Sequence, residues 1–84
     1  MKHTAIACKL VRERVLETRN KGEYPDGIDF KVYIVGGTYI LGNEKYWIST
    51  TLPDGKYYEV TYNNITNEFY LDEYVRVYNR AIKE

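Results

Sequence analysis

Disulfides, net charge and long apolar runs are all missing from this sequence, and each absence excludes a class of protein. One cysteine cannot form an internal disulfide, so nothing indicates a secreted disulfide scaffold. The 12 basic and 12 acidic side chains cancel, so the net charge implies neither a polyanionic partner nor an acidic tail. No apolar run approaches the length of a membrane span, and the N-terminus lacks a signal-peptide core. We therefore expect a cytoplasmic chain with no membrane partner.

Sets of catalytic or metal-binding residues are missing as well. His3 and Cys8 are the only soft metal ligands, and their spacing puts them on different faces of a helix. We interpret Cys8 as a core residue and His3 as part of a frayed terminus, which leaves the thiol without a base. The pair Gly36-Gly37 lacks the phosphate-loop pattern and is typical of a turn. We expect no metal, no cofactor and no catalytic residue, and hence no enzyme.

A β-hairpin is the clearest local pattern. Two runs rich in β-branched and aromatic residues, 46–52 and 56–62, flank the turn Pro53-Asp54-Gly55. A three-residue loop closed by a bulge collects the apolar side chains on one face, whereas a two-residue loop would divide them between both faces. Trp47 and Tyr57 then lie on the opposite, solvent-facing side. In that register Ile48 lies opposite Val60, and Tyr46 lies opposite Tyr62.

Residues 4–20 are predicted to form a helix. An apolar stripe recurs there at helical spacing. A lone helix cannot bury such a stripe, so the helix must pack across a sheet. The stripe consists of Ala7, Leu10, Val11 and Val15, widened by Ile6 and Cys8.

Three further segments alternate between apolar and polar residues, as strands do: 28–35, 38–41 and 68–71. Between the first two, Gly36-Gly37 favours a tight hairpin turn over a bulge in one long bent strand. Residues 73–83 fit a helix that starts after Asp72 better than they fit a strand. The predicted fold is α+β in a single domain over residues 1–84. It has an N-terminal helix packed on a four- or five-stranded antiparallel meander, with a short C-terminal helix as an option.

Part of the chain resembles a known family, the PepSY-type domains. Their closing strands show an aromatic strand, an Asp-Gly turn, a Tyr-x-Val strand and then Asp-x-x-Thr-Gly-Glu. The matching residues are Trp47, Asp54-Gly55, Tyr58, Val60, Asn63, Thr66 and Glu68. The resemblance covers residues 45–72, and it departs at Asn63, where the family favours Asp, and at Asn67, where it favours Gly. It implies an α+β, cystatin-like module that binds or inhibits a partner protein, and it carries over no catalytic residue.

Tyrosine is abundant, with 10 in 84 residues, and it suits both strands and recognition surfaces. An exposed Trp–Tyr pair ringed by Ser, Thr and Glu has the composition of an interface centre with a polar rim. The predicted protein-binding residues are Trp47, Tyr57, Glu59, Tyr33 and Thr51. The competing interpretation is that a C-terminal helix covers this face, which would make Trp47 a core residue.

Nucleic-acid binding is the alternative function. Basic residues cluster in the first quarter of the chain, where Lys9, Arg12 and Arg19 are the candidates. The acidic residues Glu13 and Glu17 lie among them, and the chain is neutral overall. This mixture favours a solvated helix face over a nucleic-acid site.

The size and composition of the chain suit a phage or mobile-element protein. The chain is short and rich in the Lys, Asn, Ile and Tyr that are typical of AT-rich genomes. Without a catalytic set, we expect it to occupy a host protein such as a defence nuclease, as an inhibitor of the anti-CRISPR or another anti-defence type. The sequence leaves the oligomeric state open.

Overall fold

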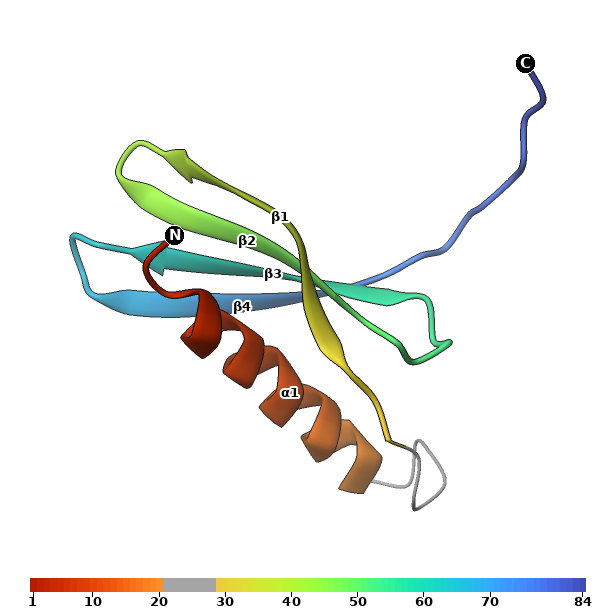
Figure 1. Cartoon of the computed structure of the whole chain (residues 1–84), viewed down its shortest axis with the longest axis horizontal. Coiled ribbons are helices and arrows are strands. Elements are labelled where there is room, and N and C mark those ends of the chain that lie inside the picture. The colour runs from red at the N-terminus through yellow and green to blue at the C-terminus, as the bar shows by residue number, and fades with distance from the viewer. Residues whose placement is uncertain (21–28) are drawn as a thin grey trace.

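A computed structural model of the chain describes residues 1–20 and 29–84, which form one helix and a four-stranded sheet (Figure 1). The elements are α1 (Thr4–Asn20), β1 (Val32–Ile40), β2 (Asn43–Thr50), β3 (Lys56–Asn63) and β4 (Glu68–Val75). The strands lie in the order β1-β2-β3-β4, and every neighbouring pair is antiparallel. Figure 1 shows α1 crossing one face of this sheet. The predicted α+β fold, a helix on an antiparallel meander, is confirmed.

The core lies between α1 and the sheet. Ala7, Val11 and Val15 are buried, as the helical spacing predicts. They pack against alternate residues of the two central strands: Tyr46 and Ile48 on β2, and Tyr58 and Val60 on β3. The stripe is narrower than predicted, because the side chain of Ile6 is 44% exposed.

The register of β2 and β3 differs from the predicted one by two positions. Ile48 lies opposite Tyr58 instead of Val60, and Tyr46 lies opposite Val60 instead of Tyr62. Side chains alternate between faces with a period of two, so this shift leaves every residue on its predicted face. The apolar set therefore still packs under α1, although the predicted pairs are wrong.

The connection between β2 and β3 explains the shift, because it spans residues 51–55 and not three residues. Its first part folds inward, since the Leu52 N–H donates to Oγ1 of Thr50 at 3.2 Å and the Leu52 side chain is buried. Its last part turns on Gly55, which has φ of 69° as the turn pattern predicts. The predicted loop, residues 53–55, assigned residues 51 and 52 to the strand. In the structure these two residues belong to the connection, and this accounts for the shift of two positions.

The strand β1 runs without a break through Gly36 and Gly37, so the predicted hairpin turn at this pair is wrong. The alternative is correct, because the pairing with β2 shifts between Ile34 and Gly36, as at a β-bulge. The chain reverses later, at Leu41 and Gly42, which have φ of 52° and 83°. A Cβ on Gly36 would lie 3.6 Å from Cε3 of Trp47, and a Cβ on Gly37 would meet the Met1 side chain. The two glycines therefore make room for packing on the two faces of the strand.

The predicted C-terminal helix is wrong as well. β4 pairs with β3 along its whole length, with Tyr74 opposite Tyr57 and Val75 opposite Lys56. Residues 76–84 have no regular secondary structure and run away from the sheet (Figure 1). A short isolated helix is marginal in water, whereas each added strand residue gains a pairing partner, so the strand pattern prevails over the helical one.

Candidate functional site

The face of the sheet that α1 leaves uncovered is the candidate site, and we call it the open face. On β2, Tyr46 and Ile48 point into the core, so Lys45, Trp47 and Ser49 point the other way. In residues 1–20 and 29–84, α1 is the only helix, and it lies on the other side (Figure 1). No second helix among these residues covers Trp47, which is 36% exposed.

Five aromatic side chains gather on the open face. Strand pairing aligns them, since Tyr33 lies opposite Ser49, Gly36 opposite Trp47 and Tyr57 opposite Tyr74. The rings of Tyr57 and Tyr74 stack, with centroids 5.0 Å apart and an interplanar angle of 15°. All five are exposed to solvent: Tyr33, Trp47, Tyr57, Tyr70 and Tyr74. The cluster is thus accessible, and stacking holds two of its rings in place.

Glu59 organises the polar part of the open face. Its Oε1 accepts a hydrogen bond from Nζ of Lys45 at 2.6 Å, and its Oε2 accepts one from the Tyr74 hydroxyl at 3.3 Å. Lys45 also donates to Oγ1 of Thr61 at 3.1 Å. The negative charge of Glu59, followed by burial, raises the pKa of Tyr74 above its ordinary value. Glu59 therefore fixes the positions of both the Lys45 ammonium group and the Tyr74 hydroxyl.

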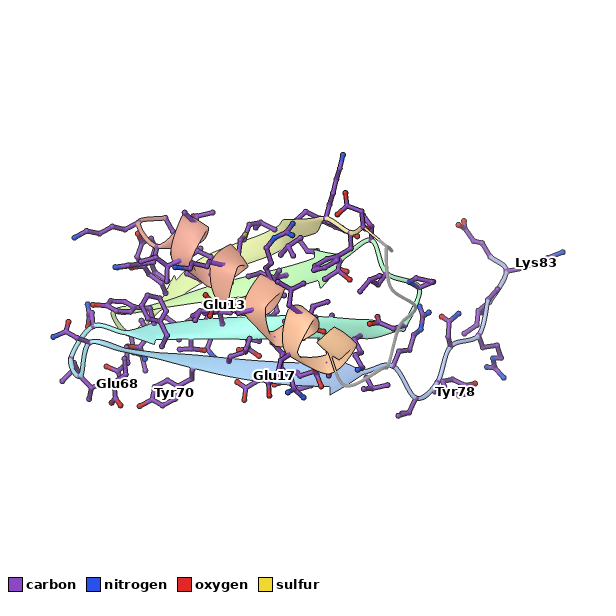
Figure 2. The ribbon with its side chains drawn as sticks, turned by 90° about the horizontal axis from the view of Figure 1, so that it is seen from below. Glu13, Glu17, Glu68, Tyr70, Tyr78 and Lys83 are labelled. Carbon is purple, nitrogen blue, oxygen red and sulfur yellow. The ribbon has the colours of Figure 1, made fainter. Side chains whose placement is uncertain are left out.

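Within the four strands, the open face carries more carboxylates than cations. Glu59 and Asp72 lie directly opposite each other on β3 and β4, and like charges at such positions repel. Lys45 compensates Glu59, but Asp72 has no cationic partner in the described part of the chain. Glu68 adds a further carboxylate, and it projects from β4 with Tyr70 (Figure 2). A ligand that brings a positive charge to Asp72 would relieve this repulsion.

An open hollow of about 690 Å³ lies at one end of the open face. Tyr57 forms one wall, Leu52 and Pro53 come from the β2–β3 connection, and Val77 and Tyr78 come from the segment after β4. The hollow extends the aromatic cluster with further apolar surface. Ser49, Lys56 and Arg76 also line the hollow, so its walls combine apolar and cationic surface.

The predicted protein-binding residues lie on this face or at its edge. Trp47, Tyr57 and Glu59 lie on it, and Tyr33 joins them at the edge strand β1. Thr51 follows β2 directly and is exposed. Its Oγ1 accepts the Lys31 N–H at 2.9 Å, and its own N–H donates to the Lys31 carbonyl at 3.0 Å.

The sequence-based prediction missed Tyr70 and Tyr74. The run Glu68, Tyr70, Asp72 and Tyr74 alternates at every second position, and this alternation could have placed all four on the open face.

The basic residues of α1 do not form a free patch. Nζ of Lys9 lies 4.0 Å from Oε1 of Glu13. Arg12 donates to the Phe30 carbonyl at 3.3 Å, and its guanidinium lies 4.8 Å from the centre of the Phe30 ring. The side chain of Arg19 lies outside the described residues. The residues proposed for nucleic acid thus have partners within the chain where the structure describes them.

A second polar cluster joins the N-terminus to the sheet, and the expectation that His3 is frayed is wrong. Nδ1 of His3 lies 2.8 Å from Oε2 of Glu44, and the imidazole stacks on Tyr62 at 4.0 Å. The Tyr46 hydroxyl also donates to Glu44. Burial acts to raise the pKa of Glu44, but the hydrogen bonds from Tyr46 and His3 outweigh it and lower that pKa. This buried cluster anchors the start of α1 to β2.

Comparison with known proteins gives a family without a described activity. None of the helices in residues 1–20 and 29–84 has the length and apolarity to cross a membrane. No curated protein and no solved structure matches the chain. One family model matches residues 4–84, from the start of α1 to the last residue. The chain therefore belongs to DUF6275, a family of unknown function.

Proposed function

We propose that this protein is a non-catalytic, cytoplasmic module whose open face binds a partner protein. The observation that carries the proposal is the group of five exposed aromatic side chains on one face of the sheet. Large aromatic residues gathered in water are typical of recognition surfaces. Trp and Tyr are also the residues most often found at the energetic centre of interfaces.

The geometry suits a pre-organised interface. Trp47 lies against Gly36, and Tyr57 is stacked on Tyr74, so these rings lose little freedom when a partner binds. The carboxylates of Asp72 and Glu68 favour a partner that presents Arg or Lys. An Arg side chain suits both features, because its guanidinium stacks on aromatic rings and pairs with carboxylates.

Nucleic acid is the second candidate, because exposed aromatics on a four-stranded sheet can stack on unpaired bases. The charges of the open face oppose it, since Asp72 and Glu68 would repel phosphates. The basic residues Lys9 and Arg12 of α1 are engaged by Glu13 and Phe30. We therefore favour a protein partner.

Within this proposal the module is an inhibitor from a phage or mobile element. It would occupy a host protein such as a defence nuclease, as an anti-CRISPR or another anti-defence protein. The composition typical of AT-rich genomes and the resemblance of residues 45–72 to PepSY-type domains support this part. The family membership neither adds to it nor opposes it.

Site-specific photo-cross-linking tests the proposal. A photoreactive amino acid replaces Tyr57 on the open face, and a matched control replaces Leu41, which is exposed at the β1–β2 turn. We expect the probe at position 57 to capture a discrete protein from a lysate of host cells, and the probe at position 41 to capture none. Adding Trp47→Ala should abolish the capture. Capture from both positions, or capture of nucleic acid alone, would contradict a protein-binding open face.

A further inference from the structure

The segment after β4, residues 76–84, leaves the sheet, and we call it the arm (Figure 1). Its first residue is held in place, because the Arg76 N–H donates to the Gly55 carbonyl at 2.9 Å. Beyond that bond the apolar side chains of Val77, Tyr78 and Ile82 are exposed, and Val77 is 94% exposed. Figure 2 shows Tyr78 and Lys83 beyond the sheet and away from α1. The arm thus presents apolar surface that the described residues of its own chain leave largely exposed.

The arm is poorly suited to fold back onto its own open face. The hydrogen bond to Gly55 directs it past the end of β4. It contains no Gly and no Pro, and Asn79 is its one residue of the types that dominate tight turns. The arm can therefore reach the open face of another molecule more readily than the open face of its own chain.

We propose that the arm of one copy lies on the open face of a second copy, whose arm returns the contact in a two-fold dimer. The inference rests on the proposed function, since it takes the open face to be a protein-binding surface. It differs from that proposal in the occupant, because a second copy takes the place of the host protein on this face. The reciprocal contact is self-complementary, as two-fold symmetry requires. No part of α1 takes part in it.

Charge complementarity supports this pairing. The arm carries Arg76, Arg80 and Lys83 against one acidic side chain, Glu84. Within its strands the open face has the opposite balance, with Glu59, Glu68 and Asp72 against Lys45. An arm cation over Asp72 would offset the repulsion between Asp72 and Glu59. An Arg80 guanidinium could also stack on the exposed rings.

The length of the arm fits the open face. An extended segment of this size spans about 30 Å, since each residue adds about 3.3 Å. A strand such as β3, with 8 residues, spans about 26 Å, so one arm is long enough to cross the sheet. The family model also extends through the arm to residue 84, so the arm belongs to the unit that defines the family.

A charge-swap experiment with the full chain tests the proposal. One variant reverses the arm, Arg80→Glu with Lys83→Glu, and a second reverses the open face, Glu68→Lys with Asp72→Lys. Sedimentation velocity measures the mass of each variant and of an equal mixture. We expect the wild type to be a dimer with twice the chain mass and each variant alone to be a monomer. The mixture should restore the dimer, because each arm then meets a face of opposite charge.

Trp47 gives an independent measurement at the site. It is the only tryptophan of the chain, and it lies on the open face. Mixing the two variants should therefore shift its emission to shorter wavelength as an arm covers it. Either variant diluted into itself serves as the control and should show no shift.

Three results would overturn the proposal: a monomeric wild type at all concentrations, a dimer that neither reversal weakens, or a mixture that stays monomeric. The proposed function fails by a different measurement. If the wild type is monomeric but the probe at position 57 still captures another protein, the open face is a binding surface whose partner is not a second copy. If that probe also captures nothing, both proposals fall.

Discussion

Nδ1 of His3 lies 2.8 Å from Oε2 of Glu44, which joins the start of α1 to β2 across 41 positions of the sequence. His3 also begins the helix, since its carbonyl accepts the N–H of Ala7 at 2.9 Å. Its own N–H donates to the Tyr46 hydroxyl at 2.9 Å. The carboxylate of Glu44 therefore sits at the positive end of the helix dipole, where a negative charge is stabilising.

Replacing His3 should destabilise the fold. We expect His3→Ala to lower the free energy of unfolding by about 1–3 kcal/mol, because the buried Glu44 carboxylate loses a hydrogen bond. Urea denaturation measures the loss. The control is Lys9→Ala on the exposed side of α1, which should change it by less than about 0.5 kcal/mol. Equal, small effects of both substitutions would mean that His3 does not anchor the helix.

The same cluster predicts how stability depends on pH at the acidic end. The pKa of Glu44 is lower in the folded chain than in the unfolded chain, where it is about 4.3. The contribution of Glu44 to the free energy of unfolding is complete above the unfolded pKa. It is lost as the pH falls through the folded pKa. Thermal melts between pH 7 and the acid limit should show a decline that Glu44→Gln reduces. An unchanged acid decline in this variant would place the responsible group elsewhere.

Tyr46 predicts a second decline at the alkaline end. Burial, followed by the hydrogen bond to Glu44, raises the pKa of Tyr46 to about 12, against an unfolded value of about 10. The folded chain holds this proton more tightly, so the contribution is complete below about pH 10 and is lost as the pH rises towards 12. Tyr46→Phe should flatten this decline in the same melts. A decline of equal steepness in the variant would contradict the assignment.

Trp47 and Ile48 are neighbours on β2 that face opposite sides, and their substitution should separate binding from folding. Trp47→Ala should weaken partner binding by about 2 kcal/mol or more. Its cost in stability should stay below the 3–5 kcal/mol or so that a fully buried Trp would lose. Ile48→Ala, at a position only 1% exposed, should cost about 2–5 kcal/mol of stability. Thermal unfolding and a binding titration check both, and a large loss of stability from Trp47→Ala would make it a core residue.

The two glycines of β1 should respond differently to a methyl group. At Gly36 the new Cβ would lie 3.6 Å from Trp47, an ordinary contact, so Gly36→Ala should cost less than about 1 kcal/mol. At Gly37 it would meet the Met1 side chain and lie 3.0 Å from the Lys45 carbonyl oxygen. We expect Gly37→Ala to cost about 1–3 kcal/mol through overpacking. Chemical denaturation measures the loss of stability in each variant. A larger loss for Gly36→Ala than for Gly37→Ala would contradict the packing described for β1.

The fold class and the faces of the sheet could be predicted because they depend on period alone. The stripe of Ala7, Val11 and Val15 repeats at helical spacing, and the central strands alternate strictly. The open-face position of Trp47 and Tyr57 follows from that alternation. Neither result requires knowing which strand residues lie opposite each other.

The features that could not be predicted depend on contacts between distant residues. The sequence Gly36-Gly37 is typical of a turn. The fold explains these glycines differently, because Trp47 and Met1 occupy the space beside them. His3 is a terminal residue in the sequence, and only the fold brings Glu44 and Tyr62 to it. The helical pattern after Asp72 is real, but pairing with β3 prevails over it as far as Val75.

The β2–β3 connection has a consequence for the evolution of the family. The connection is two residues longer than the predicted loop, and its Leu52 side chain is buried. Because the register shift is an even number of residues, every side chain of β2 and β3 stays on the same face of the sheet. A gain or loss of one residue within a strand would instead exchange core and surface along that strand. Length changes that slide one central strand past the other should therefore accumulate in pairs among relatives. The hairpin would then vary by even steps, while the pattern of apolar and polar positions remains constant.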